Sequence, residues 1–209
     1  MLNKIKDAVL KGDREAVVKF TKQAMDEGMG VKTVMDDGLI AGMDVVGQRF
    51  KANEVFIPEV LISAKAMQAG MAILEPQFVK CGIKPIGRAI IGTVKGDLHD
   101  IGKNIVGMML KGACFELEDL GIDVSPQKFI DAVRKGDAAI LVMSSLLTTS
   151  MGAMKDTIKS LKDLGLRDKV KVMVGGAPVT QGFADSIGAD AYAKDAATAV
   201  DKAKELLRC

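Results

Sequence analysis

The second part of this chain alternates short apolar runs with stretches of helical periodicity, and this alternation constrains the fold more than any other feature. Five such units follow one another from Arg88 onwards. Strands that alternate with helices form a parallel sheet with helices on both faces, so we expect an α/β domain with a five-stranded parallel sheet over residues 88–209. The expected strands are Arg88–Val94, Phe115–Leu120, Ala138–Met143, Val170–Val174 and Ala191–Ala193, and the expected helices are Ile101–Cys114, Pro126–Arg134, Thr149–Leu164, Val179–Ile187 and Ala197–Leu207.

The first part of the chain has helical periodicity throughout. From Leu2 to about Phe78, apolar residues recur at three- and four-residue spacing, in about four short helices joined by short connections. One of these helices opens at Phe56-Ile57-Pro58-Glu59, where proline suits the first turn, and is expected to run to about Leu74. This pattern predicts an N-terminal all-α helical bundle over residues 1–80, and a break in the periodicity predicts a linker at residues 81–87.

Composition and charge exclude several classes of protein. The 29 basic and 27 acidic residues are scattered along the chain and give a net charge of +2, without the basic block that nucleic-acid binding favours. No apolar run approaches the roughly 20 residues of a membrane-spanning helix. Cys81, Cys114 and Cys209 have neither CxxC nor zinc-site spacing, which indicates reduced thiols. We therefore expect a cytoplasmic protein that binds neither nucleic acid nor a membrane.

The chain contains a single histidine, His99, which lies two residues after Asp97 and three before Gly102. This arrangement suits metal ligation, because a carboxylate can hold one ring N–H and leave the other nitrogen for the metal. A glycine at this distance lets a bulky group approach the backbone. Two other segments are unusual: the hydroxyl-rich run Ser144–Ser150 and the small, open run Gly175–Thr180.

Each of these three segments directly follows an expected strand. In open parallel sheets, ligands bind beyond the carboxyl ends of the strands, and with a strand order of 2-1-3-4-5 the three strands concerned would be neighbours. Competing motifs lack essential parts. Asn104 follows Lys103 where a phosphate-binding loop needs Ser or Thr, no GxGxxG is present, and a zinc site needs more ligands than one histidine. The sequence therefore indicates a ligand site around His99.

The segments Asp97–Gly102, Ser144–Leu146 and Gly175-Gly176 together resemble the DxHxxG…SxL…GG signature of cobalamin-binding domains. The longer run Gly92–Gly107 resembles the methyltransferase branch of that family, and Phe56–Val60 is similar to the helical cap before this domain in cobalamin-dependent methionine synthase. The resemblance covers both parts of the chain and implies a Rossmann-like, flavodoxin-like α/β domain. The chain as a whole resembles a stand-alone corrinoid protein of methanogen- and acetogen-type methyltransferase systems.

The resemblance implies a role for each matching residue. His99 would be the lower axial ligand of cobalt, in place of the cofactor's own base (base-off, His-on binding). Asp97 would hold the other imidazole nitrogen, and Ser150 would complete this relay. The further implied cofactor contacts are Asp100, Gly102, Ser144, Leu146, Thr148, Gly175, Gly176 and Thr180 around the nucleotide tail, and Phe56 and Val55 over the upper face.

The implied function is that of a methyl carrier whose cobalt cycles between Co(I) and methylated Co(III). A substrate-specific methyltransferase would load the methyl group, a second would pass it to tetrahydrofolate or coenzyme M, and a reductive activase would be a third partner. The chain has no room for a catalytic domain, so we expect a non-autonomous corrinoid subunit. The main alternative is the small subunit of an adenosylcobalamin-dependent mutase, although the helical first part argues against it. A cobalamin sensor and a flavodoxin-like module without cofactor also stay open.

Overall fold

The computed structural model describes residues 1–81 and 85–207, and the chain divides into two units. The first unit comprises Met1–Pro85 with Gly112–Cys114, and the second comprises Ile86–Lys111 with Phe115–Cys209. The expected linker at 81–87 lies partly outside the described residues, at 82–84.

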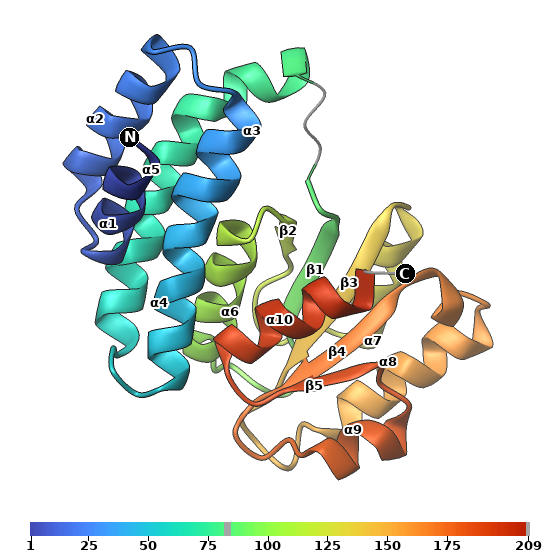
Figure 1. Ribbon diagram of the computed structural model, residues 1–209. Coiled ribbons are helices and arrows are strands. Elements are labelled where there is room, and N and C mark those ends of the chain that lie inside the picture. Colours follow the sequence, from blue (N-terminus) through green and yellow to red (C-terminus); the bar gives the residue numbers. More distant parts are fainter. Residues whose placement is uncertain (82–84, 208–209) are drawn as a thin grey trace. The chain divides into compact units, whose positions relative to one another are not determined.

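The first unit is helical, as predicted. Asp13 begins one helix by accepting a hydrogen bond from the backbone N–H of Ala16 at 3.0 Å, which satisfies a donor that a helix end leaves unpaired. At the start of another helix, the Glu59 carboxylate accepts from the Phe56 N–H at 3.0 Å, which has the same effect. The elements are α1 (Leu2–Leu10), α2 (Arg14–Asp26), α3 (Val31–Thr33), the π-helix η1 (Val34–Ile40), α4 (Ala41–Lys51) and α5 (Ile57–Cys81) (Figure 1).

Helix α5 is longer than the sequence predicted. We expected it to end at about Leu74, but it continues through Pro76 to Cys81. Its segment Ile57–Gln77 is long and apolar enough to cross a membrane by length and composition, with a mean hydropathy of 1.3, so the expectation that no apolar run approaches this length is wrong. The core helix of a soluble protein passes the same test. Here the apolar side chains of Val60, Ala64, Met67 and Leu74 are buried inside the structure.

The second unit confirms the expected sheet. Five strands form one parallel sheet in the order β2-β1-β3-β4-β5, which is the order predicted from the sequence (Figure 1). The strands are β1 (Arg88–Thr93), β2 (Glu116–Asp119), β3 (Ala138–Ser144), β4 (Lys171–Gly175) and β5 (Ala191–Ala193). The helices are α6 (Ile101–Gly112), α7 (Pro126–Arg134), α8 (Gly152–Asp163), the 3-10 helix η2 (Arg167–Lys169), α9 (Gln181–Ile187) and α10 (Ala196–Leu207).

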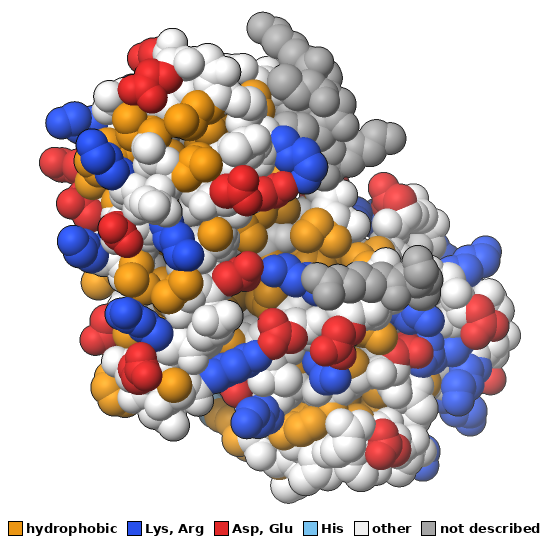
Figure 2. Space-filling view, viewed as in Figure 1, with side chains coloured by type: hydrophobic (Ala, Val, Ile, Leu, Met, Phe, Trp, Pro, Cys, Tyr) orange, Lys and Arg blue, Asp and Glu red, His pale blue; other side chains and the backbone are white. Residues whose placement is uncertain are grey.

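The core of this unit lies between the sheet and its helices. Ile90 of β1 pairs with Leu141 of β3, and both pack with Phe129 of α7 and Ile158 of α8 in one buried cluster. Helix α10 lies across the near face of the sheet in Figure 1. On the face visible in Figure 2, acidic and basic side chains lie interspersed, in keeping with their scatter along the sequence.

Two helices begin later than the sequence predicted, each for a local reason. Helix α8 begins at Gly152 instead of Thr149, because Ser150 lies in the preceding turn with its hydroxyl bonded to the Leu147 carbonyl at 2.9 Å. Helix α9 begins at Gln181 because Thr180 is its N-cap. Both differences fall on loops that leave the carboxyl edge of the sheet.

Candidate functional site

The last residues of three strands lie in one row across the sheet. Thr93 pairs with Ser144, and Ser144 pairs with Gly175. The loops that follow β1, β3 and β4 therefore leave the same edge side by side. This register brings together segments that are about 50 residues apart in the chain, including the loop that carries His99 and the loop that follows Ser144.

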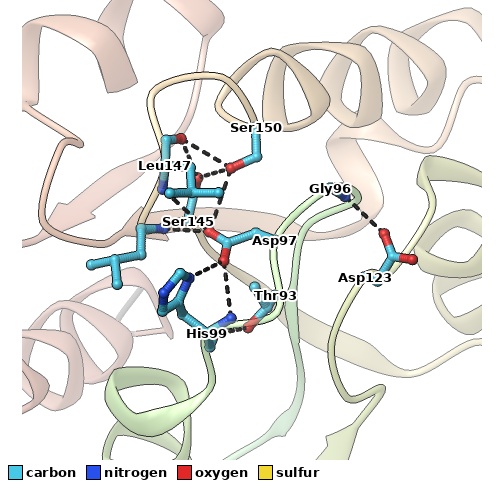
Figure 3. Close-up of polar contacts among 9 residues, drawn as sticks. Thr93, Gly96, Asp97, His99, Asp123, Ser145, Leu147 and Ser150 are labelled. Atoms are coloured by element: carbon cyan, nitrogen blue, oxygen red, sulfur yellow. Dashed lines mark hydrogen bonds and ion pairs between the residues drawn. The ribbon is translucent and has the colours of Figure 1, made fainter.

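Asp97 lies at the centre of the site, with its side chain fully buried (Figure 3). One carboxylate oxygen, Oδ1, accepts the His99 backbone N–H at 3.0 Å and lies 2.7 Å from Nδ1 of the His99 ring. The other oxygen, Oδ2, accepts the backbone N–H groups of Leu146 at 2.5 Å and Leu147 at 3.3 Å. Burial is the largest single influence and raises the pKa of Asp97, but the hydrogen bonds together outweigh it and lower the pKa from 3.8 to about 2.

His99 presents one ring nitrogen outward. Because the ionised Asp97 carboxylate can only accept hydrogen bonds, Nδ1 of the neutral His99 ring must carry the proton, which leaves a lone pair on Nε2. Among the residues that the structure describes, none forms a hydrogen bond with Nε2. The side chain is 54% exposed. This combination of tautomer and exposure suits a metal ligand.

Two buried serine hydroxyls lie behind the Asp97 carboxylate. The Oγ atoms of Ser145 and Ser150 are 2.7 Å apart, and Ser150 Oγ is 3.4 Å from Asp97 Oδ2. Both hydroxyls also lie within hydrogen-bond distance of the Leu147 carbonyl oxygen, at 3.0 and 2.9 Å respectively. Each hydroxyl has one proton to donate, so the long contact between Ser150 and Asp97 is the weakest of this set.

Gly175 and Gly176 are required by the fold itself. A Cβ atom on Gly175 would lie 2.8 Å from the carbonyl oxygen of Ala193. Gly176 has a φ of +126°, and a Cβ atom there would lie 1.8 Å from the carbonyl oxygen of Ser145. Both contacts are with backbone atoms, which cannot rotate away as a side chain can. Glycine is therefore needed at these positions whatever the loops bind.

Gly102 is different, because no contact within the described residues requires glycine at this position. It lies exposed in the first turn of α6, and a Cβ atom there would meet no heavy atom within 4 Å. Glycine within a helix is less stable than alanine by about 0.5–1 kcal/mol. Glycine at this open position, three residues after His99, would allow a ligand to approach the helix closely.

Gly102 and Gly176 allow a matched pair of variants. We expect Gly102→Ala to leave the free energy of unfolding unchanged or to raise it by about 0.5–1 kcal/mol, as measured by urea unfolding of the apo protein. Gly176→Ala should lower it by more than about 3 kcal/mol through overlap with the Ser145 carbonyl. Gly102→Leu should fold normally but retain hydroxocobalamin at least about tenfold more weakly. Unchanged retention would contradict a cofactor contact at Gly102.

Large apolar side chains around His99 are exposed. Leu98 is 69% and Ile101 72% exposed, while Leu146 and Leu147 are 44% and 39% exposed. Exposed apolar side chains gathered around a site favour a large ligand that covers them. Within the described residues, no group of three or more His, Cys, Asp or Glu side chains could hold a metal ion. One histidine, an open glycine and apolar neighbours therefore fit a metal already held in a macrocycle, as in the corrin cofactor that the resemblance implies.

The other residues implied by the resemblance have varied surroundings. The Thr180 hydroxyl accepts from the Phe183 N–H at 3.2 Å and so serves as the N-cap of α9. The Asp100 carboxylate accepts from the Asn104 side chain at 3.0 Å, at the start of α6. Thr148 is exposed, and Ser144 is the partly buried last residue of β3. Val55 and Phe56 belong to the helical unit, where Phe56 is 63% exposed; their proposed contact with the upper face stays a prediction.

The structure adds residues that sequence reasoning missed. Ser145 lies beside Ser150, and Leu147 contributes an N–H to Asp97. The Thr93 hydroxyl donates to the His99 carbonyl, and Asp123 accepts from the Gly96 N–H (Figure 3). The sequence offered two signals for these residues. Ser145 lies next to Ser144 of the SxL segment, and Thr93 lies at the end of a strand. Neither identifies a partner without knowledge of which strands are neighbours.

Comparison with known protein families supports this interpretation of the site. Residues 87–201 match a family model described as a B12 binding domain. Residues 1–75 match a second model with the same description. The two matches together extend over both units of the chain.

Individual relatives extend over nearly the whole chain. Dimethylamine corrinoid protein 3 of Methanosarcina acetivorans is 44% identical over 207 residues, which cover 99% of this chain and 97% of that protein. The crystal structure of a cobalamin-binding protein from Desulfitobacterium hafniense superimposes with a TM-score of 0.85 at 32% identity and covers 99% of this chain and 98% of that one. The methanol:cobalamin methyltransferase complex of Methanosarcina barkeri contains a chain that superimposes with a TM-score of 0.86 at 31% identity, over 98% of this chain and 78% of that one.

Proposed function

Since this chain belongs to the B12-binding corrinoid proteins of methyltransferase systems, we propose that it carries methyl groups on a bound cobalamin from one methyltransferase to another. The observation that supports this most is the buried Asp97 carboxylate, which holds Nδ1 of the 54% exposed His99 side chain, while no described residue bonds Nε2. That arrangement suits a histidine that binds cobalt in place of the cofactor's own base (base-off, His-on binding).

The residues around His99 would bind and orient the cofactor. Bound cobalamin supplies a cobalt centre that takes up a methyl group when reduced and releases it to a second acceptor. His99 would bind the cobalt through Nε2, and Asp97 would keep the ring oriented through Nδ1. Gly102 would allow the nucleotide tail to approach α6, and Leu146 would line its slot.

Asp97 would also stabilise the ring whenever both of its nitrogens carry a proton. A free Nε2 can take a proton, and the carboxylate would balance the resulting positive charge. Because the pKa of Asp97 is about 2, the carboxylate stays ionised throughout this exchange. We assign Ser150 a supporting role, since its hydroxyl is 3.4 Å from Asp97 Oδ2, farther than the backbone N–H of Leu146 at 2.5 Å.

The helical unit would protect the methyl group. Val55 and the exposed ring of Phe56 would cover the upper face and exclude water.

The partners would be a substrate-specific methyltransferase, a second methyltransferase that uses tetrahydrofolate or coenzyme M, and a reductive activase in the cytoplasm. The relative named as a dimethylamine corrinoid protein makes methylated amines the first donors to test. The neighbour in a methanol:cobalamin methyltransferase complex makes methanol the second.

The test is a reconstituted methylation assay. The full chain is loaded with hydroxocobalamin, desalted, reduced, and mixed with each donor and a methyltransferase specific for it. We expect a donor-dependent change in the visible spectrum of the bound corrinoid only when the matching methyltransferase is present. Failure with methylamine and methanol enzymes, together with activity of the chain in an adenosylcobalamin-dependent mutase, would favour the alternative function.

A further inference from the structure

Both main-chain polar groups of His99 are held by side chains. Its backbone N–H donates to Asp97 Oδ1 at 3.0 Å, and its carbonyl oxygen accepts from the Thr93 hydroxyl at 2.8 Å (Figure 3). His99 precedes α6, whose first residue is Ile101, so neither group is part of a helix or strand ladder. The position of the ring therefore depends on two side-chain contacts at its backbone, in addition to the Nδ1 contact.

Thr93 is well placed to be a rigid support. It is the last residue of β1, it is fully buried, and it pairs with Ser144 in the sheet. Its N–H donates to the Gly121 carbonyl at 3.0 Å, and its carbonyl accepts from the Val124 N–H at 2.9 Å. Because both backbone groups are engaged and the side chain is β-branched, the hydroxyl has little freedom to move.

The start of the same loop is held from the other side. Asp123 accepts the Gly96 N–H through Oδ1 at 2.7 Å, and its own N–H donates to the Asp97 carbonyl at 3.1 Å. With residues 96 and 97 anchored in this way, the remaining freedom of the loop lies near His99. The Thr93 hydroxyl restricts this part of the loop from the sheet, in addition to the contacts of His99 with Asp97.

We propose that Thr93 is a positioning residue for the cobalt ligand: its hydroxyl fixes the His99 carbonyl and thereby sets where Nε2 lies. Thr93 itself need not touch the cofactor. The inference rests on the proposed role of His99, but it concerns the geometry of the loop and can be tested without cofactor.

The test uses the fact that His99 is the single histidine of the chain. In apo protein labelled with ¹⁵N-histidine, one imidazole gives all the signals, and long-range ¹H–¹⁵N correlation reports which ring nitrogen carries the proton. Thr93→Val replaces the hydroxyl with a methyl group of similar size and suits a buried strand. We expect it to shift or broaden the His99 ring signals, while Thr93→Ser, which retains a hydroxyl, keeps them close to wild type.

A second measurement uses the full chain loaded with hydroxocobalamin. The ratio of histidine-bound to histidine-free corrinoid, read from the visible spectrum, should fall by about fivefold in Thr93→Val, as expected for loss of one neutral hydrogen bond, and recover in Thr93→Ser. Thr93→Ala removes the hydroxyl without adding bulk and should displace the same ring signals.

The proposal is overturned if the ring signals of apo Thr93→Val and Thr93→Ala superimpose on those of wild type. A purely structural role would lower the unfolding midpoint without moving these signals. If the apo signals move but no histidine-bound spectrum forms even in the wild type, the proposed cobalt ligation by His99 is wrong and the positioning of the ring by Thr93 still holds.

Discussion

Replacing His99 with alanine is expected to leave a protein that retains corrinoid but has lost the histidine-ligated spectrum and most methyl transfer. Retention should persist because, in the proposed binding mode, residues other than His99 hold the nucleotide tail. Loss of a residue that supports a metal ligand costs about 10- to 100-fold in activity, and loss of the ligand itself should cost at least as much. Visible spectroscopy of desalted, hydroxocobalamin-loaded protein and the methylation assay measure the two effects.

Two comparisons decide whether this effect comes from ligation. Added imidazole should partly restore the wild-type spectrum in His99→Gly, because the ring is more than half exposed and its place is open to solvent. Asp163→Ala, at an exposed position in α8 outside the implied cofactor contacts, should keep the histidine-ligated spectrum. If His99→Ala is methylated and demethylated at the normal rate, His99 is not the axial ligand.

Asp97→Asn is expected to lower the free energy of unfolding and to change the protonated nitrogen of the His99 ring, even in the absence of cofactor. All the partners of the carboxylate are donors: the N–H groups of His99, Leu146 and Leu147, the ring Nδ1–H of His99 and, more distantly, a serine hydroxyl. An amide would turn an NH₂ group toward some of these donors and leave them unsatisfied, at about 1–3 kcal/mol for each buried group. The proton of the ring should also shift toward Nε2, which would block ligation, and ¹⁵N NMR of the single histidine reports this change.

The stability difference between wild type and Asp97→Asn should depend on pH. The pKa of Asp97 is lowered from 3.8 to about 2, so the ionised carboxylate stabilises the folded state above pH 3.8 by about 2 kcal/mol. This contribution is lost as the pH falls through 2. The difference in free energy of unfolding between wild type and Asp97→Asn, measured by urea unfolding, should therefore be about 2 kcal/mol larger at pH 6 than at pH 2.

Asp163→Asn is the matched control for this measurement. It removes the same charge from an exposed carboxylate in α8 and should change the free energy of unfolding by less than about 0.5 kcal/mol. A difference between wild type and Asp97→Asn that does not vary between pH 6 and pH 2 would contradict the lowered pKa of Asp97.

The sheet was predictable from the sequence because each of its elements is encoded locally. Apolar spacing separates strands from helices, and the prediction of five parallel strands is confirmed. The order 2-1-3-4-5 was taken from known open parallel sheets, not from local spacing, and it is also the order observed. The ends of elements were less predictable, since α8 and α9 begin where Ser150 and Thr180 form hydrogen bonds that spacing does not reveal. The length of helix α5 was underestimated because the helix continues through polar residues and Pro76, which interrupt its apolar pattern.

The residues of the candidate site were likewise predictable only in part. The sequence by itself determined that Asp97, His99 and Gly102 lie close together after a strand, because these residues are neighbours in the chain. Only the tertiary structure decided that the N–H groups of Leu146 and Leu147 hold Asp97, since these contacts join residues about 50 positions apart and exist only when β1 pairs with β3. The same pairing therefore adds two of the hydrogen bonds that lower the pKa of Asp97, whereas the bonds from the N–H and ring of His99 are local.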